Sequence, residues 1–169
     1  MCYDISMKFF KNFLFIFILI LCSLLENSSQ NTSFFYPTYF TNISSYYGYR
    51  EIFNGTFFHN GIDFLAPQGS DVFSCTEGIV TQIGFSTSFG NYITILHSNN
   101  ISSLYGHLSS YHFVSIGDTV KEKQKISTVG PKILDNGIQN GITTGPHLHF
   151  TLFDSNKNTL DPLLYIKKE

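Results

Sequence analysis

The sequence has 169 residues, of which 43% are hydrophobic, 17% aromatic and 13% charged, and its formal net charge is -2. This apolar content excludes a disordered chain, and the lack of a basic stripe argues against a nucleic-acid-binding protein. Because the 18 Phe and 10 Tyr residues favour strands, we expect one all-β domain preceded by a short leader.

Residues 1–25 have the features of a targeting signal rather than of a folded segment. Lys8 and Lys11 precede an apolar run from Phe13 to Leu25, as in a secretory signal peptide. The run is shorter than the ~20 residues that span a bilayer. We therefore predict a cleaved signal peptide or an uncleaved membrane anchor, with lipidation at Cys22 as a third alternative. Each of these predicts an extracytoplasmic protein, in the periplasm or cell envelope, whose membrane contact is confined to this segment.

The rest of the chain divides by composition into a linker and a domain. Residues 26–45 are rich in Asn and Ser and are expected to form a linker, and residues 46–169 are expected to form the domain. Only Cys75 of the three cysteines lies in the domain, and no CxxC pair is present. A metal site in the domain would therefore consist of histidines and carboxylates.

Short apolar runs separated by Gly, Pro, Asn and Asp predict strands along the domain, and no helical periodicity competes with them. The predicted strands are residues 72–75, 79–83, 92–96, 103–105, 126–129 and 147–153. This spacing predicts an antiparallel sheet, arranged as a sandwich or barrel. The stretch from Lys132 to Gly145 is predicted to be a long loop that forms one wall of a cleft.

His147 and His149 lie two residues apart in the last predicted strand. Residues two apart on a strand face the same side, so both imidazoles can reach one site, while Leu148 and Phe150 face the core. An HxH pair alone is also compatible with surface or packed histidines.

His59 and Asp63 form a second candidate pair, placed together either by a helical turn or by a tight loop at Gly61. Zinc accepts imidazole nitrogen and carboxylate oxygen as ligands. The alternative for this pair alone is an Asp that caps a turn beside a solvent-exposed His.

The combination of the two pairs is more specific than either. Two ligands from one segment and one from a distant strand leave a fourth zinc position open for water, which is typical of a catalytic zinc site. The remaining histidines could serve as acid and base, because imidazole titrates near neutral pH.

Seven short motifs in this order resemble the M23 peptidase family, the lysostaphin- and LytM-type endopeptidases. The motifs are Gly48-Tyr-Arg50, the run from His59 to Gly69, Gly90-Asn91-Tyr92, Tyr105-Gly-His107-Leu-Ser109, Gly117-Asp118, Thr144-Gly-Pro-His-Leu-His-Phe150 and Asp161-Pro162. The resemblance extends from about Tyr47 to Ile166, nearly the whole domain.

The resemblance implies an antiparallel sheet or sandwich of the LytM type with a groove lined by loops. It implies one Zn2+ per chain, held by His59, Asp63 and His149, with His107 and His147 as catalytic histidines. His147 would act as general base, and His107 would orient the water or stabilise the oxyanion. The implied activity is that of a zinc endopeptidase that hydrolyses peptidoglycan stem peptides or cross-links, with D-Ala-linked cross-links and glycine bridges both open.

Two features depart from the family pattern. Thr151 stands where many relatives have Glu, on the same strand face as the histidines, and the loop from Lys132 to Gly145 is longer than usual. These departures affect the surroundings of the metal and the shape of the groove. For His97 and His112 we expect surface or packing roles.

Two other functions are compatible with a β-rich domain. A non-catalytic M23-like regulator that activates another cell-wall hydrolase would typically have lost metal ligands, whereas all five candidate positions are filled here. A biotinyl- or lipoyl-type carrier domain would need a modified Lys on a tight hairpin and would leave the histidines unexplained.

Overall fold

In the computed structural model, residues 33–52 and 55–167 are described, and they form thirteen strands and one short 3-10 helix. This content confirms the predicted all-β fold. The predicted antiparallel sheet is confirmed as well, because every pairing between named strands is antiparallel. The strands are β1 (Ile43–Ser45), β2 (Gly48–Ile52), β3 (Gly55–His59), β4 (Ile62–Phe64), β5 (Asp71–Phe73), β6 (Gly78–Ser86), β7 (Gly90–Leu96), β8 (Ser102–Gly106), β9 (Leu108–His112), β10 (Thr119–Val120), β11 (Lys125–Val129), β12 (Leu148–Phe153) and β13 (Thr159–Leu160), and the 3-10 helix is Pro162–Leu164.

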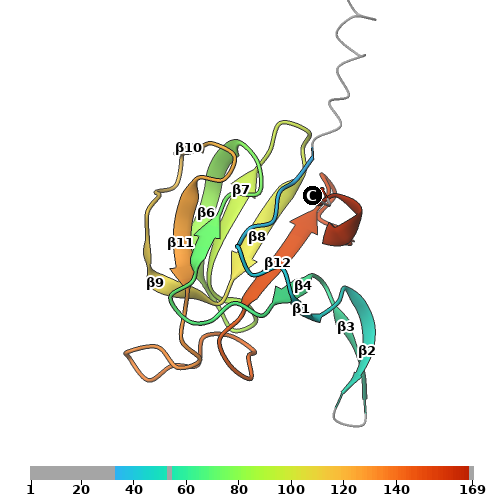
Figure 1. Cartoon of the computed structure of the whole chain (residues 1–169), viewed down its shortest axis with the longest axis vertical. Coiled ribbons are helices and arrows are strands. Elements are labelled where there is room, and N and C mark those ends of the chain that lie inside the picture. Colours follow the sequence, from blue (N-terminus) through green and yellow to red (C-terminus); the bar gives the residue numbers. More distant parts are fainter. Residues whose placement is uncertain (1–32, 53–54, 168–169) are drawn as a thin grey trace, which may run out of the picture. The chain divides into compact units, whose positions relative to one another are not determined.

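The main sheet has the strand order β1-β4-β12-β8-β7-β6-β10, with β13 paired to β12 (Figure 1). A smaller sheet has the order β5-β11-β9. Buried side chains from both sheets, such as Ile93 and Phe150 from the large one and Val72 and Ile126 from the small one, belong to a single core cluster. The core therefore lies between two antiparallel sheets, as in a sandwich.

The central strand β12 supports the candidate site from the middle of the main sheet. Leu148, Phe150 and Leu152 are fully buried in the core, as the alternation of the sequence predicts. His149 and Thr151 face the other side and are also buried, with 4% and 0% exposure. The histidine face is therefore covered by protein, which distinguishes this strand from one with a solvated face.

The structured domain begins earlier than the composition of the chain suggested. Residues 33–45, assigned to the linker from their Asn and Ser content, pack on the sheets: Phe34 is fully buried against the rings of His97 and Tyr165, and β1 pairs with β4. A few large apolar side chains decide the packing of this segment, and the average composition hides them. The predicted signal segment and the start of the linker lie outside the described residues. Residues 33–52 and 55–167 contain no helix that could span a lipid bilayer.

Strands β2 and β3 form a two-stranded hairpin that extends from the body at the lower right of Figure 1. Its register runs from the Gly48–His59 pair to the Ile52–Gly55 pair. A two-stranded hairpin is marginal in isolation, and here aromatic contacts support it, such as Tyr49 against Phe58 with ring centroids 5.0 Å apart. The hairpin therefore presents its residues beside the body rather than within the core.

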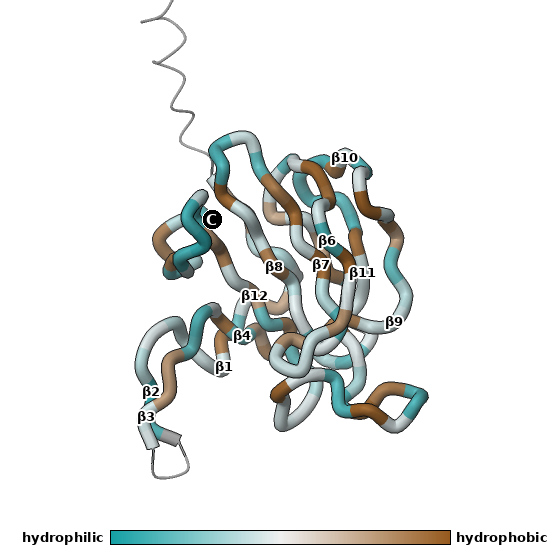
Figure 2. The backbone as a smooth tube through the Cα atoms, turned by 180° about the vertical axis from the view of Figure 1, so that it is seen from behind, coloured by the Kyte–Doolittle hydropathy of each residue, from teal (hydrophilic) through white to brown (hydrophobic). Residues whose placement is uncertain are grey.

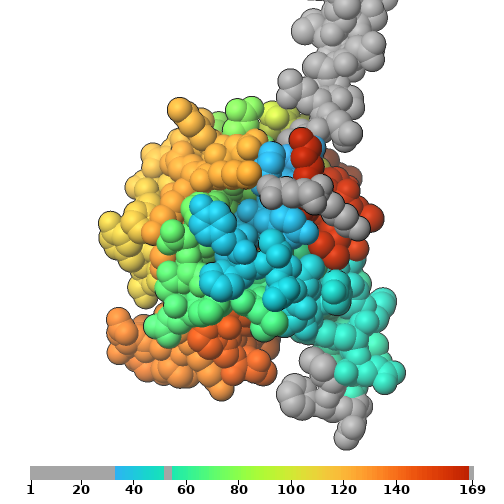
Figure 3. Space-filling model, viewed as in Figure 1, coloured from blue at the N-terminus to red at the C-terminus, as the bar shows by residue number. Residues whose placement is uncertain are grey.

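The loop between β11 and β12 extends from the same end of the molecule, opposite the hairpin (orange at the lower left of Figures 1 and 3). It carries hydrophobic stretches, visible as brown segments in Figure 2, and Ile133, Ile138 and Ile142 are exposed. The loop is nevertheless fixed at one point, because Asn140 is completely buried. Its amide donates to the carbonyls of Leu108 at 3.0 Å and Pro131 at 3.1 Å, and its Oδ1 accepts from the Asn91 N–H at 2.9 Å.

Candidate metal centre

Three strands bring His59, Asp63 and His149 together. His59 ends β3, Asp63 is the middle residue of β4, and His149 lies directly opposite Asp63 in the antiparallel β4–β12 pair. Between His59 and Asp63 the chain makes the tight loop at Gly61, the second of the two alternatives left open by the sequence. A Cβ at Gly61 would meet Thr151 Oγ1 at 2.6 Å and the His149 ring at 2.9 Å, so this loop requires glycine to pack against β12.

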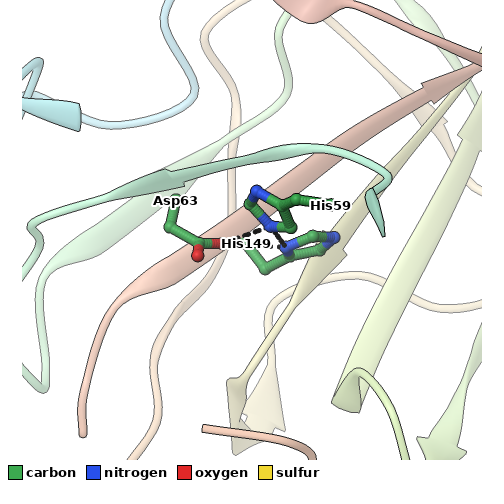
Figure 4. Close-up of side chains that lie close together, drawn as sticks. All are labelled: His59, Asp63 and His149. Carbon is green, nitrogen blue, oxygen red and sulfur yellow. Dashed lines mark hydrogen bonds and ion pairs between the residues drawn. The ribbon is translucent and has the colours of Figure 1, made fainter. Parts of the chain in front are cut away.

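The three side chains point toward one another (Figure 4). Asp63 Oδ1 lies 2.8 Å from His149 Nδ1 and 3.1 Å from His59 Nε2, and the two imidazole nitrogens are 3.1 Å apart. One potential ligand atom from each residue lies within 4.8 Å of the others, and all three residues are buried. The geometry therefore allows a single ion to contact all three.

Hydrogen bonds on the far side of each ring determine which nitrogen faces the centre. His59 Nδ1 must donate to the Tyr46 carbonyl, 2.9 Å away, because a carbonyl only accepts. His149 Nε2 lies 2.8 Å from Thr151 Oγ1 and donates there when its Nδ1 is the unprotonated nitrogen. Two imidazole lone pairs and a carboxylate oxygen then converge with no proton among them, and a cation is the partner that such a donor set fits.

The surroundings of Asp63 and His149 favour the protonation states that bind zinc. Burial acts to raise the pKa of Asp63, but the neighbouring imidazoles of His147, His149 and His59 outweigh it and hold this pKa well below its usual range. Burial lowers the pKa of His149, and the neighbouring Asp63 only partly offsets it. Zinc binds an ionised carboxylate and a neutral imidazole, so both shifts agree with a metal site.

His107 and His147 lie beside the three residues, with ring centroids 4.5 Å apart. His107 joins β8 to β9 with a φ of 56°, a left-handed conformation that is uncommon for a residue with a Cβ. Its Nδ1 donates to the Asn140 carbonyl at 2.7 Å. His147 Nδ1 lies 2.9 Å from the Gly145 carbonyl, and its Nε2 lies 3.5 Å from Asp63 Oδ1. Each ring is thus held through Nδ1.

The two histidines differ in basicity. Burial, and then the charge of His147, lower the pKa of His107 to about 4. Burial also acts to lower the pKa of His147, but the Asp63 carboxylate outweighs it and raises this pKa above its ordinary value. Two imidazoles in one site therefore have separated proton affinities, an arrangement common in acid–base pairs.

All five residues line one groove of about 670 Å³. Arg50 and Phe58 of the hairpin contribute to its lining, as do Gln139 and Thr144 of the long loop. Phe89, from the turn between β6 and β7, stacks on the His149 ring with centroids 5.3 Å apart. As the sequence predicted, the long loop forms part of the wall of the cleft that holds the candidate site.

Sequence reasoning did not identify Phe89 or Asn140 as parts of the site. The role of Asn140 depends on segments that are distant in sequence, so no local pattern indicates it. The sequence predicts Thr151 on the histidine face, and the structure shows its hydroxyl in contact with His149. His97 is buried, with Ser103 Oγ 2.8 Å from its Nε2, and does not line the groove.

Residues 57–162 match the family model described as Peptidase family M23. The chain belongs to this peptidase family. The predicted resemblance is thereby confirmed for the main part of the domain.

Curated relatives and solved structures agree with this assignment. The DD-carboxypeptidase/endopeptidase Mpg of Neisseria meningitidis serogroup B is 37% identical over 116 residues, which cover 68% of this chain and 25% of that protein. A zinc-containing peptidase from Vibrio cholerae superposes with a TM-score of 0.64 at 31% identity, covering 81% of this chain and 40% of the other. The catalytic domain of lysostaphin from Staphylococcus simulans superposes with a TM-score of 0.63 at 30% identity, covering 75% of this chain and 92% of the other. The chain spans about a quarter of the length of the Neisseria relative.

Proposed function

We propose that the domain is a zinc-dependent endopeptidase that hydrolyses peptide bonds in peptidoglycan stem peptides or cross-links. The observation that carries the proposal is the convergence of two imidazole lone pairs and one carboxylate oxygen, within 4.8 Å of one another, in an open groove. Three protein ligands leave one zinc position open, as in catalytic rather than structural zinc sites. The peptidoglycan substrate is supported by the name of another relative, the Peptidoglycan DD-endopeptidase ShyC of Vibrio cholerae, which is 36% identical over 92 residues.

Each site residue has a proposed role. His59 Nε2, Asp63 Oδ1 and His149 Nδ1 would hold the zinc, which supplies a Lewis acid and lowers the pKa of a coordinated water. His147, whose Nε2 faces Asp63, would accept the proton of the attacking water. His107, held through Nδ1 by the Asn140 carbonyl, would direct Nε2 at the water or at the developing oxyanion.

The proposed place of action is outside the cytoplasm, in the periplasm or cell envelope, because peptidoglycan is assembled and cut there. The N-terminal apolar run supports this placement. A regulator without catalytic activity is the less supported alternative, since all five candidate side chains are present and line one groove.

Metal content and hydrolysis together test the proposal. Purified wild-type protein is expected to contain about one zinc per chain and to release soluble muropeptides from purified sacculi. His149→Ala should lose the metal and the hydrolysis while keeping the fold by circular dichroism. His112→Ala is the matched control, because His112 does not line the groove and its Nδ1 contacts Ser127 instead. Full hydrolysis by metal-free wild type would refute the proposal.

A further inference from the structure

Phe89 makes a contact with the candidate metal centre that the proposed chemistry does not use. Its ring lies on the ring of His149, with centroids 5.3 Å apart and planes inclined by 30°. The rings of His59 and His107 also approach His149, at 5.0 Å and 6.0 Å, but they are polar and more steeply inclined to it, by 54° and 70°. Of these three neighbouring rings, Phe89 is therefore the apolar one and the one that stacks.

Gly106 makes room for this contact. It pairs directly with His149 across β8 and β12. A Cβ at Gly106 would lie 3.4 Å from the Cβ atoms of both His149 and Phe89, and 3.2 Å from the Phe89 carbonyl oxygen. The absence of a side chain at this strand position thus lets the turn that carries Phe89 lie close to the strand that carries the ligand.

Backbone hydrogen bonds fix the turn on two sides. The turn joins β6 to β7 through residues 87–89. The Phe89 carbonyl accepts from the His107 N–H at 2.7 Å, and the Ser88 carbonyl accepts from the Ile142 N–H of the long loop at 2.9 Å. A change of the Phe89 side chain leaves these bonds in place, so the effect of the ring can be separated from the effect of the turn.

An aromatic ring in this position acts on the metal centre in two ways. Stacking restricts the rotation of the imidazole, so that Nδ1 of His149 stays directed at the point it shares with Asp63. An apolar cover also limits the access of water to a ligand, and the apolar shell of a metal site controls that access. We infer that Phe89 is a positioning residue that holds the His149 ring in its zinc-binding orientation and shields it from water. This inference rests on the zinc site of the proposed function and adds to it a residue outside the ligand set.

A series of variants at position 89 separates the two effects. Phe89→Ala should weaken zinc binding by about 3- to 10-fold, because it removes both the stacking ring and the apolar cover. Phe89→Leu keeps a cover without a planar ring and should lie between Phe89→Ala and the wild type, whereas Phe89→Tyr should restore most of the affinity. The measurement is the zinc dissociation constant of the purified full chain by competition with a chelator. Phe85→Ala, on β6 and outside the groove lining, is the matched control and should bind zinc as the wild type does.

A double-mutant cycle with Thr151→Val gives a readout that a general loss of packing would not move. The Thr151 hydroxyl holds the same imidazole from its Nε2 side. Because Phe89 and Thr151 would both act by orienting one ring, the affinity lost in the double variant should be smaller than the product of the two single losses. Phe85→Ala combined with Thr151→Val should show no such coupling.

The outcomes that would overturn the inference are specific. They are wild-type zinc affinity in Phe89→Ala, an equal loss in Phe89→Leu and Phe89→Tyr, or independent effects of Phe89→Ala and Thr151→Val. If circular dichroism shows that Phe89→Ala does not fold, the comparison of the Leu and Tyr variants decides. A wild type that binds zinc but releases no muropeptides from sacculi would count against the proposed function alone, because the zinc measurements do not depend on turnover.

Discussion

At the scale of single residues, the direction of each metal-facing nitrogen depends on a hydrogen bond on the far side of its ring. For His59 the partner is a backbone carbonyl, whereas for His149 it is the hydroxyl of Thr151. Only the second partner can be removed by a conservative side-chain change. Thr151 is completely buried, so water does not replace its hydroxyl easily.

Thr151→Val should therefore weaken zinc binding by about 10- to 100-fold while the protein stays folded, because His149 loses the partner that fixes its tautomer. The measurement is the zinc dissociation constant by competition with a chelator. Thr94→Val is the matched control, since the buried Thr94 Oγ1 has no partner among the described residues. Wild-type affinity in Thr151→Val, or an equal loss in the control, would contradict this role.

The positions of single residues in the site were only partly predictable from the sequence. The two-residue period of a strand was sufficient to place His147, His149 and Thr151 on one face, and the structure brings His59 and Asp63 to the same point. Phe89 could not be predicted to cover His149, because it lies on a turn whose approach depends on how β7 and β8 pair. Such contacts arise from tertiary packing and leave no local pattern.

At the scale of elements, the long loop before β12 is attached to the sheets through Asn140. Its amide group joins the loop to Leu108 and Asn91, and its backbone carbonyl holds His107. Added Cβ atoms at Gly130 or Gly141 would collide with Asn140 or with the neighbouring turn. One residue thus sets both a wall of the groove and the orientation of a candidate catalytic ring.

Asn140→Ala should lower the free energy of unfolding by about 1–3 kcal/mol, since it leaves buried backbone groups without partners. It should also lower kcat on sacculus-derived peptides, with zinc content retained, because the loop that carries the carbonyl bonded to His107 loses its side-chain anchor. Urea unfolding and steady-state kinetics measure the two effects. Asn156→Ala, on an exposed turn, is the control and should change neither. A normal kcat in Asn140→Ala would show that the anchoring of the loop does not affect catalysis through His107.

The strands with clear apolar runs, from β5 to β8 and then β11 and β12, were predicted close to their observed positions. The first four strands and β9, β10 and β13 were not predicted; among them, β1 and β4 have three residues each and show no full alternation. The place of β4 in the sheet is determined by β12, to which it is hydrogen-bonded, rather than by its own sequence.

At the scale of the whole molecule, the segment before β1 completes the core. Phe34 bridges to Ile166 near the end of the described chain, and the Phe35 N–H donates to the Cys75 carbonyl at 2.7 Å. Phe34→Ala should therefore cost about 3–5 kcal/mol of stability, as for other fully buried aromatic residues. Phe40→Ala, at a side chain that is 42% exposed, is the control. Thermal unfolding measures the difference, and equal midpoints would show that this segment is dispensable.

The β2–β3 hairpin carries both His59 and Arg50, with Ser45 in contact with the two side chains. A displacement of this ribbon would move a candidate metal ligand and the arginine of the groove as one piece. Zinc binding and peptide binding in the groove would then be linked equilibria. Such coupling is reciprocal, so a bound peptide would raise the affinity for zinc by the same factor by which zinc raises the affinity for the peptide.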